Sequence, residues 1–318
     1  MHTGSVLFVV READGGRRGR LERRCTEAAV RHGYEPRLLE SPQGAEDWRE
    51  RIVTAVARAV ADGVRLVVAV GGDGTVGATA HSLAGTEAAL AVVPTGAANL
   101  FARALRVPFE FDAALSTAFL GSEREVDLAF VDGKAVVAMA GIGVDAAVVA
   151  ATTSAAKEVL GWPGYGLATV SHLSGRAHHF EVQFDDGSTV AAEAQSVVVA
   201  NVGTLPAGLA LSPRVRVDDG LLDVAILAPR GPLGWAVLLS DMFRAGRLGI
   251  ASARLAPRQT RAVTVSTESE LPMQLDGEPI PPGRELAARI AEGALTTRVP
   301  RTRQARSAPR PLPAPRLR

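Results

Sequence analysis

The sequence has 318 residues and a mass of 33.1 kDa, and its 47% hydrophobic and 22% charged residues exclude a chain that is disordered throughout. Its length is enough for two domains, each with its own core. The formal net charge of +1 hides an uneven distribution, because the last 18 residues hold six arginines and no acid. The remaining 300 residues carry 29 basic and 34 acidic groups, a net charge of −5. A single cysteine, Cys25, excludes an internal disulfide and a cysteine-rich zinc site.

The start of the chain predicts a strand. Residues 1–10 have an apolar centre but no basic segment before it, which is unlike a signal peptide. The most apolar stretch, 135–151, is interrupted by Asp145 and is shorter than the roughly 20 residues of a membrane span. A cytoplasmic protein is therefore expected.

The first 105 residues alternate between strand and helix patterns. The wholly apolar, valine-rich segment 66–70 is typical of a strand buried on both faces, and apolar residues every four positions over 48–60 indicate a helix. Repeated strand–helix units predict a parallel sheet with helices on both faces. The predicted elements are strands at 6–10, 37–40, 66–70 and 90–93, and helices around 21–28, 48–60, 76–83 and 101–105.

After about residue 122 the pattern favours an antiparallel, β-rich domain. Residues 180–184 alternate between apolar and polar before Asp185-Asp186-Gly187, a strong hairpin signal. Further strands are predicted at 125–131, 135–140, 196–202, 221–227, 262–267 and 285–290, with helices near 145–177 and 233–247. From residue 301 onward arginine and proline dominate, which predicts a disordered tail over 301–318.

A glycine-rich turn, Gly71-Gly72-Asp73-Gly74-Thr75, follows the buried strand at 66–70 and precedes a helix. Glycines let the backbone approach a ligand closely, and amides at a helix start favour anions. A carboxylate in such a turn makes sense if it acts through Mg²⁺ bound to phosphates. A lone turn of this kind is more often only a tight connection, but its place at the carboxyl end of a strand favours ligand binding.

A second glycine turn follows the next predicted strand, over residues 94–103 with the sequence PTGAANLFAR. It contains Gly96 and Asn99. Because the carboxyl ends of neighbouring parallel strands meet at one edge of a sheet, the two turns are expected to lie side by side.

The two turns together resemble the diacylglycerol kinase catalytic-domain family, which pairs GGDGT with P-x-G-x-x-N-x-x-A-R. Three later landmarks occur in the family's order, and they are GIGVDA at 141–146, DGLLD at 219–223 and DGEP at 276–279. The resemblance covers nearly the whole chain ahead of the tail. The family includes sphingosine, ceramide and bacterial lipid kinases, and is distantly related to NAD kinases.

The resemblance implies an architecture of two domains. An α/β nucleotide-binding domain over 1–122 and a β-rich lipid domain over 123–292 would meet at a cleft. Residues 293–300 would return to the first domain.

The resemblance also implies an ATP- and Mg²⁺-dependent lipid kinase that phosphorylates a hydroxyl of diacylglycerol or a related lipid. Asp73 would hold the catalytic Mg²⁺, and either Asp276 or Glu278 would act as the general base. The implied ATP-binding residues are Gly71, Gly72, Asp73, Gly74, Thr75, Gly96, Asn99, Gly15 and Ser41. Asp218, Asp223 and the Leu221 carbonyl resemble a structural Mg²⁺ site, although an ordinary acidic turn accounts for them equally well.

The chain departs from the family pattern in two places. The family's Asn-Pro-x-Ser-Gly loop after the first strand is replaced by residues 11–15 (READG), and the usual Thr after Gly96 is Ala97. A lost hydrogen bond of this kind costs about 0.5–1.5 kcal/mol, enough to weaken ATP binding without abolishing it.

Two alternatives remain open. An NAD kinase also carries GGDGT, but its Asn-Glu pair occurs nowhere in this chain. The altered first loop is compatible with a non-catalytic lipid- or nucleotide-binding paralogue, whereas the retention of Asp73, Asp276 and Glu278 favours an enzyme.

A lipid kinase without a membrane span must meet its substrate at the bilayer surface, so a peripheral location is expected. The arginine-rich tail could assist, since each exposed basic residue near anionic lipid contributes about 1 kcal/mol. Nothing in the sequence indicates nucleic-acid recognition, and a homodimer stays open.

Overall fold

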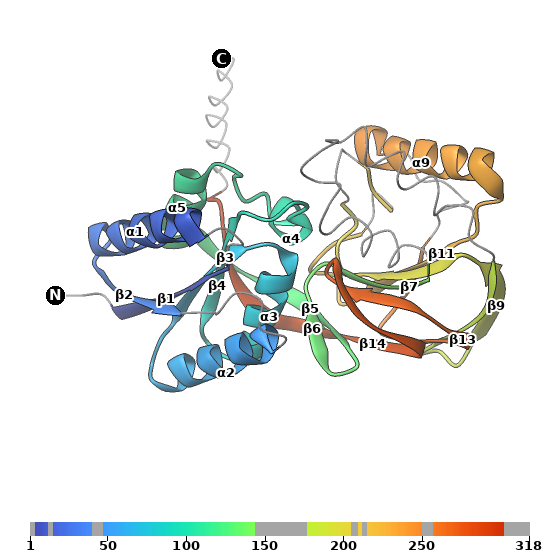
Figure 1. Ribbon diagram of the computed structural model, residues 1–318, viewed down its shortest axis with the longest axis horizontal. Coiled ribbons are helices and arrows are strands. Elements are labelled where there is room, and N and C mark those ends of the chain that lie inside the picture. Colours follow the sequence, from blue (N-terminus) through green and yellow to red (C-terminus); the bar gives the residue numbers. More distant parts are fainter. Residues whose placement is uncertain are drawn as a thin grey trace, which may run out of the picture.

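The computed structural model describes residues 4–11, 15–39, 47–143, 177–204, 209–211, 215–249 and 257–301. It has an α/β domain at the N-terminal side and a β-rich domain beside it (Figure 1). This confirms the predicted fold class. The predicted helix near 145–177 and the tail beyond residue 301 lie outside the described residues, and the cleft between the domains stays a prediction.

The first domain is a parallel sheet with the strand order β4-β3-β1-β2. Helices α1 and α5 cover one face, and α2 and α3, which contact each other, cover the other (Figure 1). The elements are β1 (Gly4–Val10), α1 (Gly15–Arg31), β2 (Tyr34–Leu39), α2 (Trp48–Ala61), β3 (Leu66–Gly71), α3 (Asp73–Leu83), β4 (Ala89–Pro94), α4 (Leu100–Ala104) and α5 (Phe111–Leu120).

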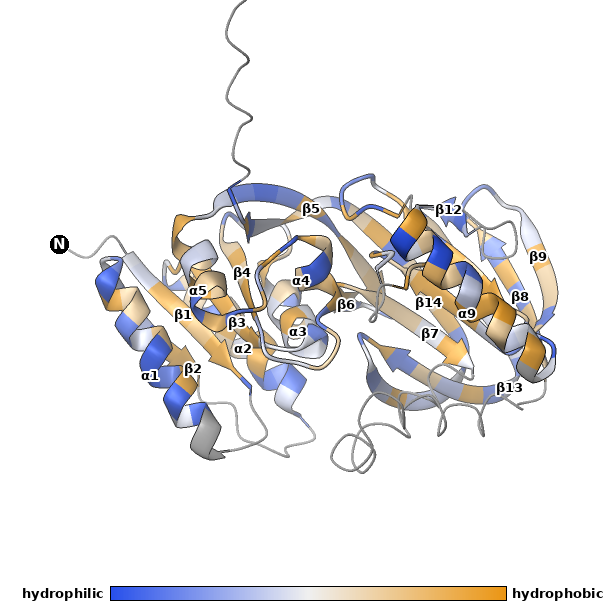
Figure 2. Ribbon diagram, turned by 90° about the horizontal axis from the view of Figure 1, so that it is seen from above, coloured by the Kyte–Doolittle hydropathy of each residue, from blue (hydrophilic) through white to orange (hydrophobic). Residues whose placement is uncertain are grey.

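The central strands β3 and β4 are buried along their whole length. Their continuous apolar residues suit a strand that is covered by helices on both sides. Figure 2 shows apolar residues along β1 and polar residues along much of α1. The sequence therefore predicted these strands well, because burial on both faces leaves a clear apolar run.

The described part of the second domain is built of antiparallel strands, with helix α9 on its outside (Figure 1). Its described elements are β5 (Ser122–Val131), β6 (Lys134–Val136), β7 (Met139–Gly143), β8 (His178–Phe184), β9 (Thr189–Ala194), β10 (Ser196–Ala200), β11 (Leu222–Leu227), α9 (Gly231–Leu248), β12 (Arg258–Thr260), β13 (Ala262–Leu275) and β14 (Glu278–Val299). Strand β13 pairs with β8 near its start and with β7 near its end. Register shifts around Leu271 separate these two parts, and irregularities of this kind bend a strand around a core.

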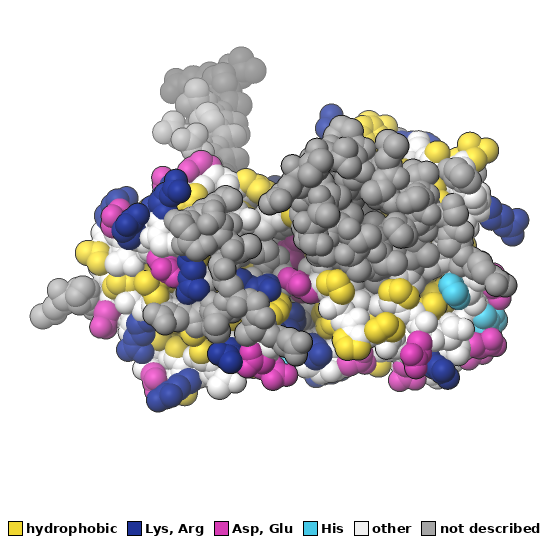
Figure 3. Space-filling model, in the orientation of Figure 1, with side chains coloured by type: hydrophobic (Ala, Val, Ile, Leu, Met, Phe, Trp, Pro, Cys, Tyr) yellow, Lys and Arg dark blue, Asp and Glu magenta, His cyan; other side chains and the backbone are white. Residues whose placement is uncertain are grey.

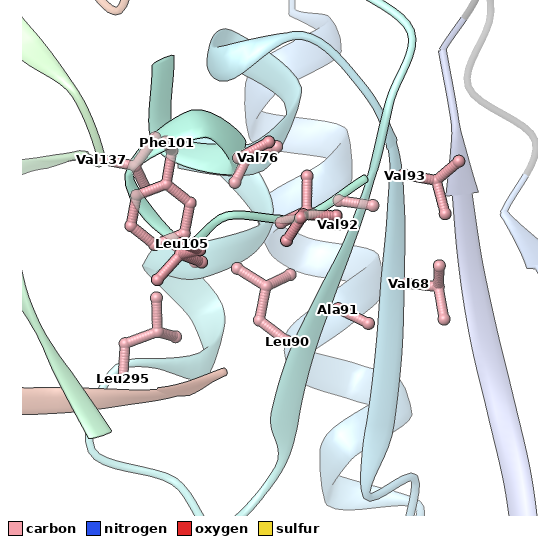
Figure 4. Close-up of a cluster of buried hydrophobic side chains, with 14 of the residues drawn as sticks. Val68, Val76, Leu90, Ala91, Val92, Val93, Phe101, Leu105, Val137 and Leu295 are labelled. Carbon is pink, nitrogen blue, oxygen red and sulfur yellow. The ribbon is translucent and has the colours of Figure 1, made fainter. Parts of the chain in front are cut away.

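Strand β14 belongs to both domains. It pairs with β13 in the second domain, runs antiparallel to β5, and at Thr297 pairs in parallel with Leu90 of β4. Near this pair, Leu295 is fully buried and lies beside Leu90, Leu105 and Phe101 (Figure 4). The C-terminal part of β14 thus completes the core of the first domain.

Several predicted strands have different limits in the structure: β2 begins at Tyr34 where 37–40 was expected, and β13 extends to Leu275 where 262–267 was expected. Two further differences have a clear physical cause. The strand expected at 135–140 is divided into β6 and β7, because the amides of Val137, Ala138 and Met139 donate to the carboxylate of Asp276. The strand expected at 285–290 is part of the much longer β14. Both differences come from pairing with distant segments, which a local pattern does not reveal.

Among the described residues, every helix is too short or too polar to cross a membrane.

Leu295→Ala is expected to lower the free energy of unfolding by about 2–5 kcal/mol, because it leaves a cavity between the end of β14 and α4. Urea unfolding followed by circular dichroism measures the change. The matched control is Leu120→Ala, whose side chain is half exposed and whose effect should stay within about 0.5 kcal/mol. Equal effects for the two variants would contradict the role given to β14.

Candidate active site

The two glycine turns are in direct contact. Gly71, the last residue of β3, pairs with Pro94, the last residue of β4, so both turns leave the same edge of the sheet. A Cβ atom added to Gly96 would lie only 2.4 Å from the Cα atom of Gly72. Glycine is therefore required where the two backbones meet, and the expectation that the turns lie side by side is met.

Asp73 joins the two turns through hydrogen bonds. It is the first residue of α3, and its carboxylate accepts from the amides of Leu100, at 2.8 Å, and Phe101, at 3.0 Å. Burial raises the pKa of Asp73, while these two amides act in the opposite direction. The carboxylate thus caps α4 and lies at the centre of the site.

Asn99 shapes the second turn. Its backbone is left-handed, with φ of 49°, and its side-chain amide donates to the Gly96 carbonyl at 2.7 Å. Its side-chain oxygen accepts from the Gly96 amide at 3.0 Å. Both groups hold the turn closed.

Asp276 and Gly277 form the tight turn between β13 and β14, with φ of 51° and 79°. Positive φ at both central residues is typical of a two-residue hairpin turn. The Asp276 carboxylate is buried, and burial together with the charge of Asp73 raises its pKa to about 7. A Cβ atom at Gly77 would lie 2.6 Å from Asp276 Oδ2, so Gly77 leaves room for this carboxylate against α3.

Of the two candidate general bases, Asp276 and Glu278, it is Glu278 whose carboxylate is accessible. Its side chain is 40% exposed, and a Cβ atom at Gly74 would lie 2.8 Å from its Cγ atom. Asp276 instead uses both oxygens to accept backbone amides. Only Glu278 therefore combines exposure with direct proximity to the first glycine turn.

Three further residues complete this site and were not among the predicted site residues. The guanidinium of Arg11 lies 3.2 Å from Glu278 Oε1 and 3.5 Å above the ring of Trp48. Arg49 donates to the Ala135 carbonyl, and burial lowers its pKa against the opposing charges of Asp276 and Glu278. One signal for Arg11 was available, because it directly follows β1 at the same sheet edge as the glycine turns.

A pocket of about 370 Å³ adjoins the second turn. Gly96 and Asn99 line it together with Arg20, Arg24 and Phe109. A cavity with glycine backbone and two arginines on its wall suits a phosphorylated ligand. Of the remaining predicted ATP-binding residues, Gly15 is the first residue of α1, and Ser41 lies outside the described residues.

The structural Mg²⁺ group of Asp218, Asp223 and the Leu221 carbonyl stays a prediction. Asp218 is paired with Arg124 and with Arg216, at 3.1 Å from the latter. Burial acts to raise the pKa of Asp218, but hydrogen bonds from the two arginines hold this pKa below its ordinary value. The carboxylate whose charge acts on Asp223 is that of Asp219.

Asp223 is the buried member of this acidic group. Its side-chain atom Oδ2 has no hydrogen-bond partner among the described residues. Burial, followed by the charge of Asp219, raises its pKa to about 7. A buried carboxylate oxygen without a donor, next to a second carboxylate, fits a hard cation, which Asp219, Asp223 and the Leu221 carbonyl could hold.

At the glycine turns, each oxygen of Asp73 accepts one backbone amide and keeps a second lone pair that could bind Mg²⁺. The described residues contain no group of three or more His, Cys, Asp or Glu side chains placed to hold a metal. Mg²⁺ is ordinarily bound by one or two carboxylates together with water and substrate phosphates, so a single carboxylate beside a phosphate site is compatible with it.

Comparison with protein families accounts for both domains. The model described as diacylglycerol kinase catalytic domain matches residues 5–131, and the YegS C-terminal NAD kinase beta sandwich-like domain matches residues 138–297. A protein of Pseudomonas aeruginosa (strain UCBPP-PA14) described as probable lipid kinase YegS-like is 36% identical over 254 residues, which are 77% of this chain and 80% of that protein. The chain belongs to the diacylglycerol kinase family.

Two further comparisons, one with a sequence relative and one with a solved structure, give the same result. A probable lipid kinase YegS-like protein of Pseudomonas savastanoi pv. phaseolicola is 37% identical over 77% of this chain and 79% of its own length. The crystal structure of a diacylglycerol kinase from Bacillus anthracis str. Sterne superposes with a TM-score of 0.72 at 22% identity, covering 93% of this chain and 96% of that one. This second likeness concerns the fold.

In Mg²⁺-free buffer, the raised pKa of Asp223 predicts a loss of stability as the pH rises from about 4 to about 7. In that window the unfolded chain releases the proton while the folded chain retains it, so the folded state becomes less favourable. Asp223→Asn should remove its share of the slope, roughly 3 kcal/mol between pH 4 and 7. Urea unfolding of both proteins at several pH values measures the difference, and identical slopes would contradict the prediction.

Addition of Mg²⁺ at pH 7 is expected to raise the melting temperature, because the cation would neutralise Asp219 and Asp223. Asp219→Asn should abolish this response. Asp218→Asn is the matched control and should retain it, since Arg124 and Arg216 already engage that carboxylate. Thermal unfolding by calorimetry measures the response of both variants. A response lost only in the Asp218 variant would favour the predicted group of Asp218, Asp223 and the Leu221 carbonyl.

Proposed function

We propose that this chain is an ATP- and Mg²⁺-dependent kinase that transfers the γ-phosphate to a hydroxyl of diacylglycerol or a related lipid. The observation that carries the proposal is the position of Glu278, an accessible carboxylate packed against Gly74 of the first glycine turn. This arrangement puts a proton acceptor beside a backbone suited to phosphates. The descriptions of the relatives as probable lipid kinases support the lipid as acceptor.

Phosphate binding would rest on the two glycine turns. The first turn leads into α3, whose 11 residues begin at Asp73 with Gly72 as the preceding cap. Amides at a helix start carry partial positive charge and have no partner within the helix, so they favour phosphate oxygens. Gly96 and Asn99 line the adjoining pocket, where the remaining part of the nucleotide would bind.

Glu278 would take the proton of the acceptor hydroxyl as its oxygen attacks the γ-phosphorus. The new O–P bond forms while the bond from that phosphorus to the β,γ-bridging oxygen breaks, and ADP leaves with the electron pair. Arg11 would orient the Glu278 carboxylate, because its guanidinium lies 3.2 Å from Glu278 Oε1. Asp73 would hold the Mg²⁺, which supplies neutralisation of phosphate charge.

Asp276 would act as a positioning residue. Its hydrogen bonds to Val137, Ala138 and Met139 hold the turn that precedes Glu278. Proton transfer at a fixed hydroxyl depends on this geometry.

Glu278→Gln is expected to lower kcat at least 100-fold with the KM for ATP little changed, because the amide cannot accept the proton. The matched control is Glu270→Gln, an exposed glutamate of β13, which should leave kcat unchanged. Transfer of labelled phosphate from ATP to dispersed diacylglycerol measures both.

The acceptor is tested with diacylglycerol, sphingosine, ceramide and NAD in parallel. Phosphorylation of a lipid supports the proposal. Phosphorylation of NAD alone would establish an NAD kinase, and ATP binding without transfer to any acceptor would establish a binding protein. Full activity of the Glu278 variant would contradict the base assignment.

A further inference from the structure

Helix α9 presents an apolar surface on the outside of the second domain. Its buried face contacts the domain through Trp235, Leu238, Met242 and Ala245. The opposite face exposes large apolar side chains, with exposed fractions of 78% for Leu233, 37% for Val237, 44% for Leu239, 46% for Phe243 and 63% for Leu248. Exposed apolar residues that are clustered in this way mark a surface with a partner.

The charged residues of α9 on this face are basic. Arg244 and Arg247 lie among the apolar side chains, and the Arg247 guanidinium lies 5.7 Å from the ring centre of Phe243. Among the described residues of the helix, the one acid is Asp241, which is buried and lies 3.7 Å from Arg244. Figure 3 shows hydrophobic and basic side chains along the upper rim of the second domain, where α9 runs in Figure 1.

More positive charge lies next to the C-terminal end of α9. A pocket of about 870 Å³ is bounded by Ala245 and Gly246 of the helix, by Arg106 and Arg301, and by Arg216, which is paired with Asp218 in the same wall. Its wall also includes Ala104 and Leu105, at the end of the helix α4 that Asp73 caps. The pocket therefore connects the C-terminal end of α9 with the C-terminal end of α4.

We propose that α9 is a docking helix that lies flat in the surface of a bilayer containing anionic lipid. At 1.5 Å per residue, its 18 residues span about 27 Å. A helix with one buried face, and arginines among leucine and phenylalanine on the other, has the pattern of an interfacial helix. The arginines match anionic headgroups, which argues for a bilayer as the occupant. This inference rests on the proposed lipid kinase activity for its purpose, but its binding test is independent of catalysis.

The test measures co-sedimentation with vesicles of phosphatidylcholine containing 30% phosphatidylglycerol. The triple variant Leu233→Gln, Leu239→Gln, Phe243→Gln is expected to bind at least ten-fold more weakly, because the apolar contacts with the acyl region are lost. The matched control is Val30→Gln, Leu38→Gln, Leu120→Gln, three exposed apolar residues of the first domain, and it should bind within two-fold of the unaltered chain.

A second pair of variants tests the charge. Arg247→Gln should weaken binding to the anionic vesicles about five-fold and leave binding to pure phosphatidylcholine unchanged. Arg58→Gln, an exposed arginine of α2, is the control and should have no effect. Melting temperatures show that all variants are folded.

Activity distinguishes this inference from the proposed function. With a short-chain diacylglycerol dispersed in water the triple variant should match the unaltered chain, and with a long-chain diacylglycerol in vesicles its rate should fall at least ten-fold. An unaltered chain that binds vesicles through α9 but phosphorylates neither lipid would refute the kinase proposal and uphold the docking helix. Vesicle binding that is unchanged in the triple variant would overturn the docking helix. So would a dimer that this variant converts to monomer without loss of vesicle binding, because α9 would then contact a second copy.

Discussion

The contact between the two glycine turns is the constraint on which the candidate site depends. Gly96 approaches Gly72 so closely that it leaves no space for a side chain, and a Cβ atom at Gly72 would also make a tight contact, at 3.3 Å from the Cα atom of Gly96. The Asp73 carboxylate then reaches the amides at the start of α4. One carboxylate thus closes the gap between two strand ends. It also remains beside Asp276, whose pKa its charge helps to raise. The proposed phosphate binding and the placement of negative charge would thus depend on the same few atoms.

Strand β14 transmits this arrangement to the second domain. Its first residue is Glu278, beside the first glycine turn, and near its other end Thr297 pairs with Leu90 of β4. A single strand therefore supplies the proposed base at one end and completes the first core with Leu295 at the other (Figure 4). Relative movement of the domains would have to disturb this strand. The position of the proposed base therefore depends on the stability of the pairing between β14 and the strands of both domains.

The acidic residues show how burial separates roles that look alike in sequence. Asp276 and Glu278 are two residues apart, yet one is enclosed by three backbone amides and the other is accessible to a substrate. Asp218 and Asp219 are adjacent, yet arginines engage the first while the second acts on Asp223. In each pair the local sequence indicates a carboxylate, and the distant partners decide what it can do.

The strands β3 and β4, the glycine turns and the α/β followed by β-rich order could all be predicted from the sequence. Each leaves a local signal, such as a continuous apolar run or a glycine cluster after a strand. The division of 135–140 into two strands, the full length of β14, and the pairing of Arg11 with Glu278 could not, because each depends on residues more than a hundred positions apart. The sequence by itself thus determined the family, the two domains and the types of residue at the site. The tertiary structure decided which carboxylate is accessible, because burial and hydrogen-bond partners are properties of the packed chain.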